Sequence, residues 1–186
     1  MNAYDFDGTI YRGDSSVDFC LYALRRHPAL IRFLPGMAGA ALRYGLGKNS
    51  KTEMKQAFFR FFSSLETEKM TKDFWDRHLE RIYPWYLEQR REEDLIISAS
   101  PEFLLRPACD RLGIRHLIAS RVDPRSGVFQ GENCRGEEKV RRLRETMPGA
   151  KLDRFYSDSL SDTPLAKLAD QAFLVKKGEP RPWTLS

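Results

Sequence analysis

The chain has few of the side chains that form disulfides or bind transition metals: it contains three cysteines and three histidines among 186 residues. The cysteines are odd in number and lack a CxxC spacing, which excludes a disulfide framework and a zinc site of that pattern. The histidines lie singly along the chain, and we assign them no role. We expect free thiols in a reducing compartment, and therefore a cytoplasmic protein (Cys20, Cys109, Cys134).

Long apolar runs, internal repeats and low-complexity segments are also missing. No run approaches the length of a membrane span or of a signal segment. Because a candidate catalytic acid stands at position 5, we expect no cleaved leader, whose removal would also remove Asp5. A chain of 186 residues can bury a sizeable core and still carry a unit that covers a substrate.

What the chain does have is a pair of carboxylates at its start. Asp5 and Asp7 are separated by one residue at the end of a short apolar run, and Gly8 and Thr9 follow them. A turn at Gly8 can bring both carboxylates to the rim of a sheet. The pattern predicts a nucleophile beside a proton carrier, and the alternative is a strand followed by a solvated Asx turn.

Three further polar sites follow in order. Ser98 ends an apolar run, and the Ser-Pro pair at 100–101 is typical of an N-cap and first helical position, a terminus that suits phosphate. Lys139 lies at the start of a helical segment, and Asp158 and Asp162 follow another apolar run. Each of these residues alone also has a purely structural explanation. Ser98 could be a cap or a core hydroxyl, and Lys139 a solvated charge on a helix. Asp158 and Asp162 could be an N-cap and its solvent-facing neighbour.

The alternation of apolar runs and helical patterns predicts an α/β fold with a doubly wound, Rossmann-like parallel sheet. In such sheets ligands bind beyond the carboxyl ends of the strands at the topological switch point, where these polar sites would meet. The expected strands are residues 2–6, 94–98, 115–119, 152–156 and 172–175, and the expected helices between them include 102–112, 137–146 and 162–170.

Between the first two strands lie some eighty residues without a strand signal. That connection is far longer than a usual crossover and must fold into its own unit. We therefore predict a core domain of residues 1–11 and 93–186 and a helical cap domain of residues 12–92. The expected cap helices are residues 14–27, 28–46, 51–64, 67–81 and 82–92, and a turn excursion is expected at 122–129.

The whole net positive charge of the chain lies in the predicted cap. Residues 12–92 carry fifteen Lys/Arg and ten Asp/Glu, whereas the remaining residues carry sixteen of each. Amphipathic helices with solvated faces explain this pattern. A surface for anionic substrates or anionic lipid head groups also explains it. No nucleic-acid binding is expected, since no stacking-aromatic platform accompanies the charge. Residues 25–60 hold eight bases and one acid (Arg25, Arg26, Arg32, Arg43, Lys48, Lys51, Lys55, Arg60; Glu53).

The four sites together resemble the motifs of the haloacid dehalogenase-like (HAD) phosphohydrolase superfamily. The motifs that carry the resemblance are Asp-Phe-Asp-Gly-Thr at 5–9, Ser98, Lys139, and the acids of Ser-Asp-Ser-Leu-Ser-Asp at 157–162. The helical insertion after the first strand is similar to the C1-type cap of subfamily IB, which includes phosphoserine phosphatases. The resemblance implies a HAD-type fold and a phosphatase.

The resemblance also implies the chemical steps. Asp5 would attack phosphorus in line and become an aspartyl-phosphate, while Asp7 would protonate the leaving oxygen and later activate water. Mg²⁺ is expected, held by Asp5, the main-chain carbonyl of Asp7 and Asp158. Asp162 would support the metal site by orienting a metal-bound water or the catalytic lysine.

The phosphoryl oxygens would be bound by Thr9, Ser98 and Lys139. Phosphoserine phosphatases carry a glutamate nine residues after the nucleophile, whereas this chain has Asp14, and Ser98-Ala99-Ser100 replaces their Ser-Gly-Gly. Free phosphoserine is therefore not the favoured substrate. Cap residues proposed by position alone to contact the substrate are Asp14, Lys55 and Arg60.

The function that follows is a Mg²⁺-dependent phosphomonoester hydrolase acting on a small phosphorylated metabolite. The alternative is a lipid-phosphate phosphatase with a phosphatidylglycerophosphate-like substrate, in which the basic cap contacts an anionic membrane. A non-enzymatic phosphoprotein-binding module is less favoured, because it would not need all four motifs intact.

Overall fold

The structure, a computed structural model, describes residues 1–184 and contains one six-stranded sheet in the order β3-β2-β1-β4-β5-β6. Strands β1 to β5 are parallel, and β6 pairs antiparallel with β5 at the edge. The predicted doubly wound parallel sheet is confirmed, with its switch point between β1 and β4. The strands are β1 (Asn2–Tyr4), β2 (Leu95–Pro101), β3 (His116–Ser120), β4 (Leu152–Ser157), β5 (Ala169–Lys176) and β6 (Glu179–Pro182).

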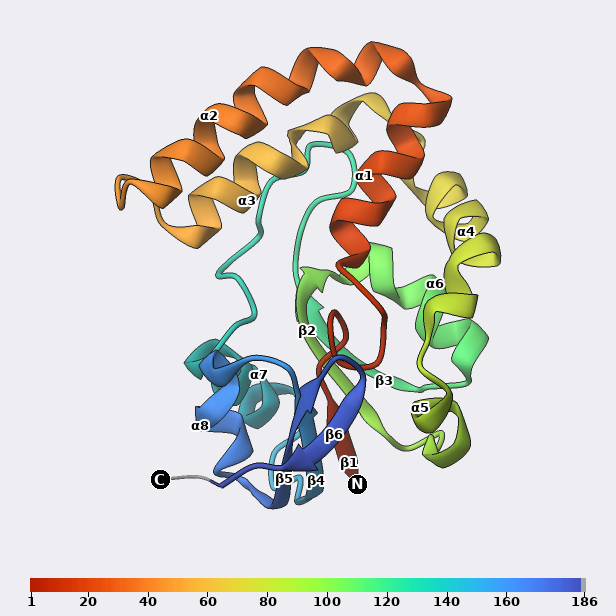
Figure 1. Cartoon of the computed structure of the whole chain (residues 1–186), viewed down its shortest axis with the longest axis vertical. Helices are drawn as coiled ribbons and strands as arrows, with labels where there is room; N and C mark the ends of the chain where they lie inside the picture. The colour runs from red at the N-terminus through yellow and green to blue at the C-terminus, as the bar shows by residue number, and fades with distance from the viewer. Residues whose placement is uncertain (185–186) are drawn as a thin grey trace.

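Helices cover the sheet and fill the long connection between β1 and β2 (Figure 1). Within residues 1–184, no helix combines the length and the apolar character needed to cross a membrane. The connection contains α1 (Ser15–Arg26), η1 (Pro28–Phe33), α2 (Leu34–Gly45), α3 (Lys51–Phe59), η2 (Arg60–Ser64), α4 (Thr67–His78), η3 (Leu79–Arg81) and α5 (Pro84–Gln89). The core helices are α6 (Glu102–Leu112), α7 (Glu137–Thr146), η4 (Leu160–Asp162) and α8 (Thr163–Ala166).

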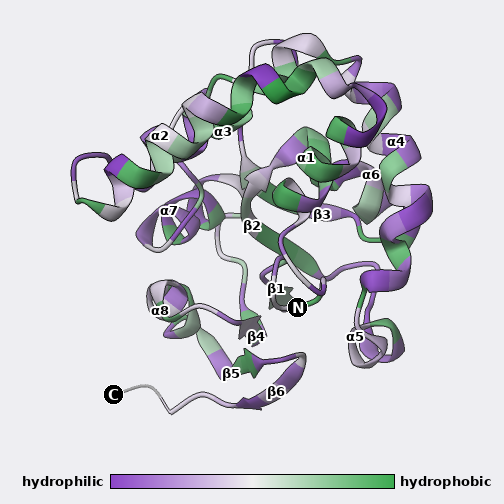
Figure 2. Ribbon diagram, turned by 45° about the horizontal axis from the view of Figure 1, so that its top comes forward, coloured by the Kyte–Doolittle hydropathy of each residue, from purple (hydrophilic) through white to green (hydrophobic). Residues whose placement is uncertain are grey.

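Both faces of the sheet are buried, as the unbroken apolar strands require. In β2, Leu95 and Ile97 pack under α7 and α8, whereas Ile96 faces the opposite cluster with Leu104 and Leu105 of α6. The alternation follows the period-2 geometry of a strand. Figure 2 shows β2 as a hydrophobic segment in the middle of the molecule.

The inserted helices share a hydrophobic core with the sheet. One cluster of buried side chains runs from Tyr4 and Phe6 through Trp75 to Phe19 and Phe62 in the insertion. The indole nitrogen of Trp75 donates a hydrogen bond to the carbonyl of Leu104 at 2.5 Å. The insertion is therefore packed directly on the core, and the predicted domain boundaries remain a prediction.

Several predicted elements differ locally. The helix expected at 28–46 is divided into η1 and α2, since Pro35 at the start of α2 begins a new helix. The helix expected at 162–170 ends at Ala166, and β5 begins three residues later. β2 continues through Pro101, which is itself the N-cap of α6, so Ser100 does not cap that helix. Strand β6 was not expected, because two of its four residues are proline.

Residues 121–136 leave the core as a long loop that reaches the inserted helices (Figure 1). Val122 and Phe129 form an isolated antiparallel bridge within this loop, at the predicted excursion. Gln56 of α3 donates to the carbonyl of Gly127 at 2.8 Å and accepts from the amide of Phe129 at 2.9 Å. The loop therefore ties α3 to the core.

The contact between this loop and α3 depends on a glycine. Gly127 has φ +72°, and a Cβ at this position would lie 2.0 Å from the carbonyl oxygen of Phe59. We expect Gly127→Ala to lower the free energy of unfolding by about 2 kcal/mol or more, through left-handed strain and this clash. Gly149→Ala is the matched control, with φ +76° and no atom within 4 Å of the added carbon. The measurement is the free energy of unfolding in urea. If Gly127→Ala and Gly149→Ala lower it equally, the contact between the loop and α3 contributes nothing to stability.

Candidate active site

The chain turns sharply after β1 and brings the first two acids into one pocket. The carbonyl of Phe6 accepts from the amides of Thr9, Ile10 and Tyr11, which closes the turn. Gly8 is required there: its φ is +71°, and an added Cβ would lie 2.3 Å from an Asp158 carboxylate oxygen. The glycine thus lets the loop after β4 approach the loop after β1.

The pocket at the carboxyl ends of β1, β2 and β4 has a volume of about 260 Å³. A larger, open hollow of about 620 Å³ lies at the amino ends of the strands, around Met1 and His116, and holds none of the predicted site residues. We take the smaller pocket as the site because the acids and the buried lysine converge there. The predicted residues that line it are Asp5, Asp7, Asp14, Lys55, Ser98, Lys139, Asp158 and Asp162.

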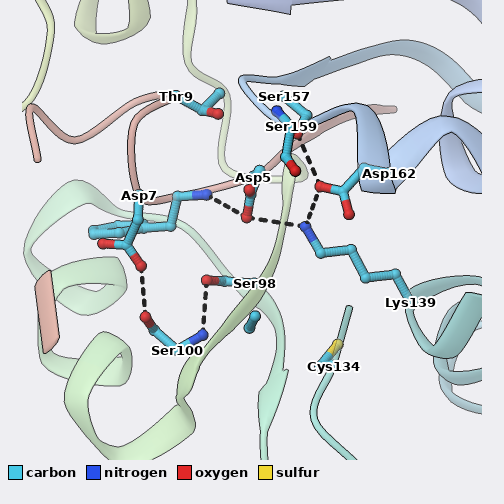
Figure 3. Close-up of polar contacts among 12 residues, drawn as sticks. Asp5, Asp7, Thr9, Ser98, Ser100, Cys134, Lys139, Ser157, Ser159 and Asp162 are labelled. Atoms are coloured by element: carbon cyan, nitrogen blue, oxygen red, sulfur yellow. Dashed lines mark hydrogen bonds and ion pairs between the residues drawn. The ribbon is translucent and has the colours of Figure 1, made fainter. Parts of the chain in front are cut away.

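Lys139 links two of the acids (Figure 3). Its ammonium lies 3.0 Å from Asp5 Oδ1 and 2.7 Å from Asp162 Oδ2, and its side chain is 1% exposed. The hydroxyl of Ser157 also donates to Asp162 Oδ2, at 2.8 Å. Burial lowers the pKa of Lys139, but the two carboxylates raise it by more, so the ammonium stays charged.

Asp7 is held by two other donors. Its Oδ1 accepts from the amide of Ser15 at the start of α1, at 2.6 Å, and its Oδ2 accepts from the hydroxyl of Ser100 at 2.5 Å. The Ser98 hydroxyl accepts from the amide of Ser100 at 3.1 Å, which positions the end of β2 (Figure 3). The carboxylate of Asp7 is thereby fixed on the side of the pocket next to the inserted helices.

Burial changes the acidity of both motif carboxyls. Desolvation raises the pKa of Asp5 to about 7, although the ammonium of Lys139 opposes the shift. Desolvation and the nearby charge of Asp14 raise the pKa of Asp7 to about 6, while the bond from Ser100 opposes the rise. Burial also raises the pKa of Asp158. A pocket with three such acids favours either protons or a bound cation.

The donor set fits a hard divalent cation. No group of three His, Cys, Asp or Glu side chains in residues 1–184 is arranged as a metal cluster, but the expected set needs only two carboxylates and a main-chain carbonyl. Among the described hydrogen bonds, none occupies Asp5 Oδ2 or the Asp7 carbonyl. The buried Oδ1 of Asp162 also has no hydrogen-bond partner among the described atoms. Oxygen atoms are therefore free to bind Mg²⁺.

Two predicted residues lie elsewhere. Thr9 is completely buried, and its hydroxyl accepts from the amide of Asp158 at 2.9 Å, so it holds the loop after β4 and does not line the pocket. Arg60 follows the end of α3, in η2, where the backbone changes to a 3-10 turn and its side chain is exposed outside the pocket. Phosphate binding by Thr9 and substrate contact by Arg60 stay predictions, since the structure places both residues outside the lining of the pocket.

Five polar residues of the pocket were not among the predicted site residues: Lys51, Ser100, Arg135, Ser159 and Ser161. Ser100 bonds to Asp7, while Lys51 and Arg135 line the pocket from α3 and from the loop before α7. Lys51 stands four residues before Lys55 on α3, a spacing that places both on one helix face and could have identified it. No sequence signal identified Arg135, because its place depends on the path of the 121–136 loop.

The fold and site define a class: an open α/β protein with paired aspartates at the switch point of a parallel sheet. The model of the family "HAD: haloacid dehalogenase-like hydrolase" matches residues 3–167. The chain belongs to this family of hydrolases.

Two curated relatives are similar in sequence. Protein CicA of Caulobacter vibrioides is 28% identical over 200 residues, which cover 96% of this chain and 87% of that protein. A histidinol-phosphatase of Neisseria meningitidis is 31% identical over 96 residues, which cover 45% of this chain and 43% of that enzyme. The first similarity spans both the core and the inserted helices.

Solved structures share the fold. A Bordetella pertussis protein of unknown function superposes with a TM-score of 0.79 at 20% identity, over 94% of this chain and 88% of that one. A phosphoserine phosphohydrolase-like protein from Francisella tularensis superposes with a TM-score of 0.62 at 16% identity, over 94% and 87% of the two chains. The inserted helices therefore belong to a known arrangement.

The raised pKa of Asp7 has a consequence for stability. A carboxyl with a raised pKa binds its proton more tightly in the folded state, so its contribution to stability is greatest below pH 4 and is lost as pH rises to about 6. In EDTA we expect Asp7→Asn to raise the free energy of unfolding at pH 8 by up to about 3 kcal/mol, and to leave it unchanged at pH 4.

The measurement is urea unfolding at both pH values. Asp170→Asn, the same change at an exposed position of β5, is the control and should alter stability at neither pH. A destabilised Asp7→Asn protein at pH 8 would contradict a net cost of ionising Asp7.

Proposed function

We propose that the protein hydrolyses small phosphate monoesters with Mg²⁺ through an aspartyl-phosphate at Asp5. The observation that carries the proposal is the state of this carboxylate: Oδ1 is held by Lys139 and by the amide of Phe6, while Oδ2 has no hydrogen-bond partner among the described atoms. A fixed carboxylate with one free oxygen at the pocket wall is arranged to attack phosphorus.

In the first step a bond forms between an Asp5 oxygen and phosphorus while the ester bond to the leaving oxygen breaks. Lys139 offsets the negative charge on the phosphoryl group, and the hydroxyl of Ser98 lies in reach of its oxygens. Asp5, Asp158 and the carbonyl of Asp7 would hold Mg²⁺, which when bound would neutralise further phosphoryl charge. Asp162 positions Lys139 for this role.

Asp7 is proposed as the proton carrier. Its pKa of about 6 is close to neutrality, so the carboxyl can give a proton to the leaving oxygen and later take one from the water that cleaves the aspartyl-phosphate. Ser15 and Ser100 fix both of its oxygens, which sets the direction of transfer.

The side of the pocket next to α3 is positively charged. Lys51, Lys55 and Arg135 have no carboxylate within salt-bridge distance in the described chain, and burial lowers the pKa of both lysines. Lys55 donates to the carbonyl of Ala99 at 2.8 Å. We propose that the leaving group carries a second anionic group, bound by Lys51 and Arg135, with Asp14 at the edge of the same space.

A second candidate substrate is an ester with an apolar leaving group, as in a lipid phosphate. The supporting observation is a small cavity of about 130 Å³ that shares Asp14, Met54 and Lys55 with the catalytic pocket. Its other walls are mainly apolar (Val17, Met37, Ala41, Phe58, Phe59). A phosphoprotein-binding module without activity fits less well, because it needs neither the free Asp5 oxygen nor a proton carrier. The cytoplasmic location inferred from the cysteines, all three of them buried and free, stays part of the proposal.

The nucleophile and the metal can be tested together. We expect Asp5→Asn to reduce kcat on p-nitrophenyl phosphate by several orders of magnitude, because the amide neither attacks phosphorus nor holds Mg²⁺ well. EDTA should abolish the activity of the unsubstituted enzyme until Mg²⁺ is added back. Asp110→Asn, at an exposed position of α6, is the control and should keep full activity. Turnover that persists in EDTA would contradict the metal assignment.

The basic side of the pocket gives a separate prediction. Lys51→Met and Arg135→Met should each raise KM about tenfold or more for esters with a second anionic group, and should leave KM for p-nitrophenyl phosphate nearly unchanged. Arg60→Met is the matched control, since Arg60 lies outside the pocket. The measurement is KM from steady-state kinetics on both esters. An equal rise in KM for both esters would mean that Lys51 and Arg135 support the folding of the site and do not bind the second anionic group.

A further inference from the structure

The segment from residue 19 to residue 52 contains no acidic residue. It covers most of α1, then η1, α2 and the turn before α3. We name the exposed part of this segment the basic cap surface, and its charged members are Arg25, Arg26, Arg32, Arg43 and Lys48, all of which are exposed. Five exposed bases in a segment without acids give this part of the molecule an excess of positive charge.

These bases form no salt bridge within the described chain, although Glu66 and Asp73 line a hollow together with Arg26, and the charge of Arg43 acts on Glu53. None of the salt bridges found in residues 1–184 includes one of them. The guanidinium of Arg26 lies 3.8 Å from the ring centre of Tyr22, and Arg32 donates to the hydroxyl of Ser64. Their positive charges therefore face solvent.

The same surface exposes large apolar side chains. Ile31 is 65% exposed, Leu42 is 66% exposed and Leu46 is 61% exposed, and Ala40 is the one buried residue of α2. Leu34, Ala38 and Leu42, which are spaced by four residues, share the outward face of α2. Figure 1 shows α2 along the outer edge of the cap with α3 beneath it, and Figure 2 shows pale to green colouring over much of α2.

The combination of exposed leucines and bases without salt bridges favours an anionic lipid bilayer over a second copy of the chain as the partner of this surface. A second copy of the chain docked through a two-fold axis would place this surface against itself, so that the five bases of one copy would face the five bases of the other. An anionic lipid bilayer supplies the opposite charge and an apolar layer just below it.

We propose that the basic cap surface binds the surface of an anionic phospholipid membrane, with Ile31, Leu42 and Leu46 at the boundary between head groups and acyl chains. Arg25, Arg43 and Lys48 lie at the head-group level and bind lipid phosphates. The inner side of α2, through Met37 and Ala41, lines the apolar cavity next to the catalytic pocket, so the membrane-bound helix also borders the site. The proposal does not depend on the proposed catalytic function.

The experiment is co-sedimentation of the full chain with vesicles. We expect binding to vesicles of phosphatidylcholine mixed with phosphatidylglycerol, little binding to phosphatidylcholine alone, and release of the protein as salt is raised. Asp5→Asn should bind as well as the unsubstituted chain, which separates this surface from catalysis.

Two sets of variants test the assignment. Arg25→Glu, Arg43→Glu and Lys48→Glu combined should weaken partitioning about a hundredfold. The matched control makes the same change in net charge at exposed positions outside the inserted helices. It combines Lys151→Glu, Lys167→Glu and Lys176→Glu and should retain most of the binding to vesicles.

Leu42→Gln with Leu46→Gln should weaken partitioning about tenfold. The control pair Val128→Gln with Leu168→Gln, also at exposed positions, should change nothing. The cap variants and their core controls, which leave Asp5 in place, should keep the activity on p-nitrophenyl phosphate and the far-UV circular dichroism of the unsubstituted chain, which verifies the fold.

Three results would overturn the proposal. The first is no binding to anionic vesicles, and the second is an equal loss of vesicle binding in the cap variants and in their core controls. The third is a stable dimer that dissociates when Leu42→Gln and Leu46→Gln are combined. The last result, read from light scattering after size-exclusion chromatography, would assign the surface to self-association.

Discussion

The site depends on one buried cation, the ammonium of Lys139. Removal of such a charge from water costs several kcal/mol unless partners surround it, and Asp5 and Asp162 provide them at 3.0 and 2.7 Å. Asp5 follows β1, Asp162 ends η4 after β4, and Lys139 lies in the first turn of α7. The ion pairs therefore hold three distant segments together at the switch point of the sheet. They also orient the carboxylate that the proposed chemistry uses.

The inserted helices are coupled to this site through packing. A continuous cluster of buried aromatic side chains joins them to the sheet, and the loop 121–136 bonds to Gln56 of α3. Displacement of α3 would break both of these hydrogen bonds and separate the rings of Phe59 and Phe129, whose centres are 5.7 Å apart. Because Lys51 and Lys55 line the pocket from the same helix, the proposed substrate contacts and the attachment of the inserted helices share one element.

The sequence predicted the parallel sheet and most of the catalytic pocket, because apolar runs that end in Asp5, Ser98 and Asp158 carry their own signal. It did not predict features that depend on packing. Arg135 reaches the pocket only through the path of the loop before α7, and Thr9 turns toward the amide of Asp158. Arg60, which was proposed by position alone, lies outside the lining of the pocket, where α3 becomes a 3-10 turn.

The central claim is that the phosphoryl group passes through Asp5 on its way to water. Each in-line displacement at phosphorus inverts its configuration, so two successive displacements give overall retention. The most direct measurement is the stereochemical course of hydrolysis, with an ester made chiral at phosphorus by sulfur and oxygen isotopes and with isotopically labelled water. We expect the inorganic thiophosphate product to show retention of configuration. Inversion would mean that water attacks the ester directly, and it would contradict the role of Asp5 as nucleophile.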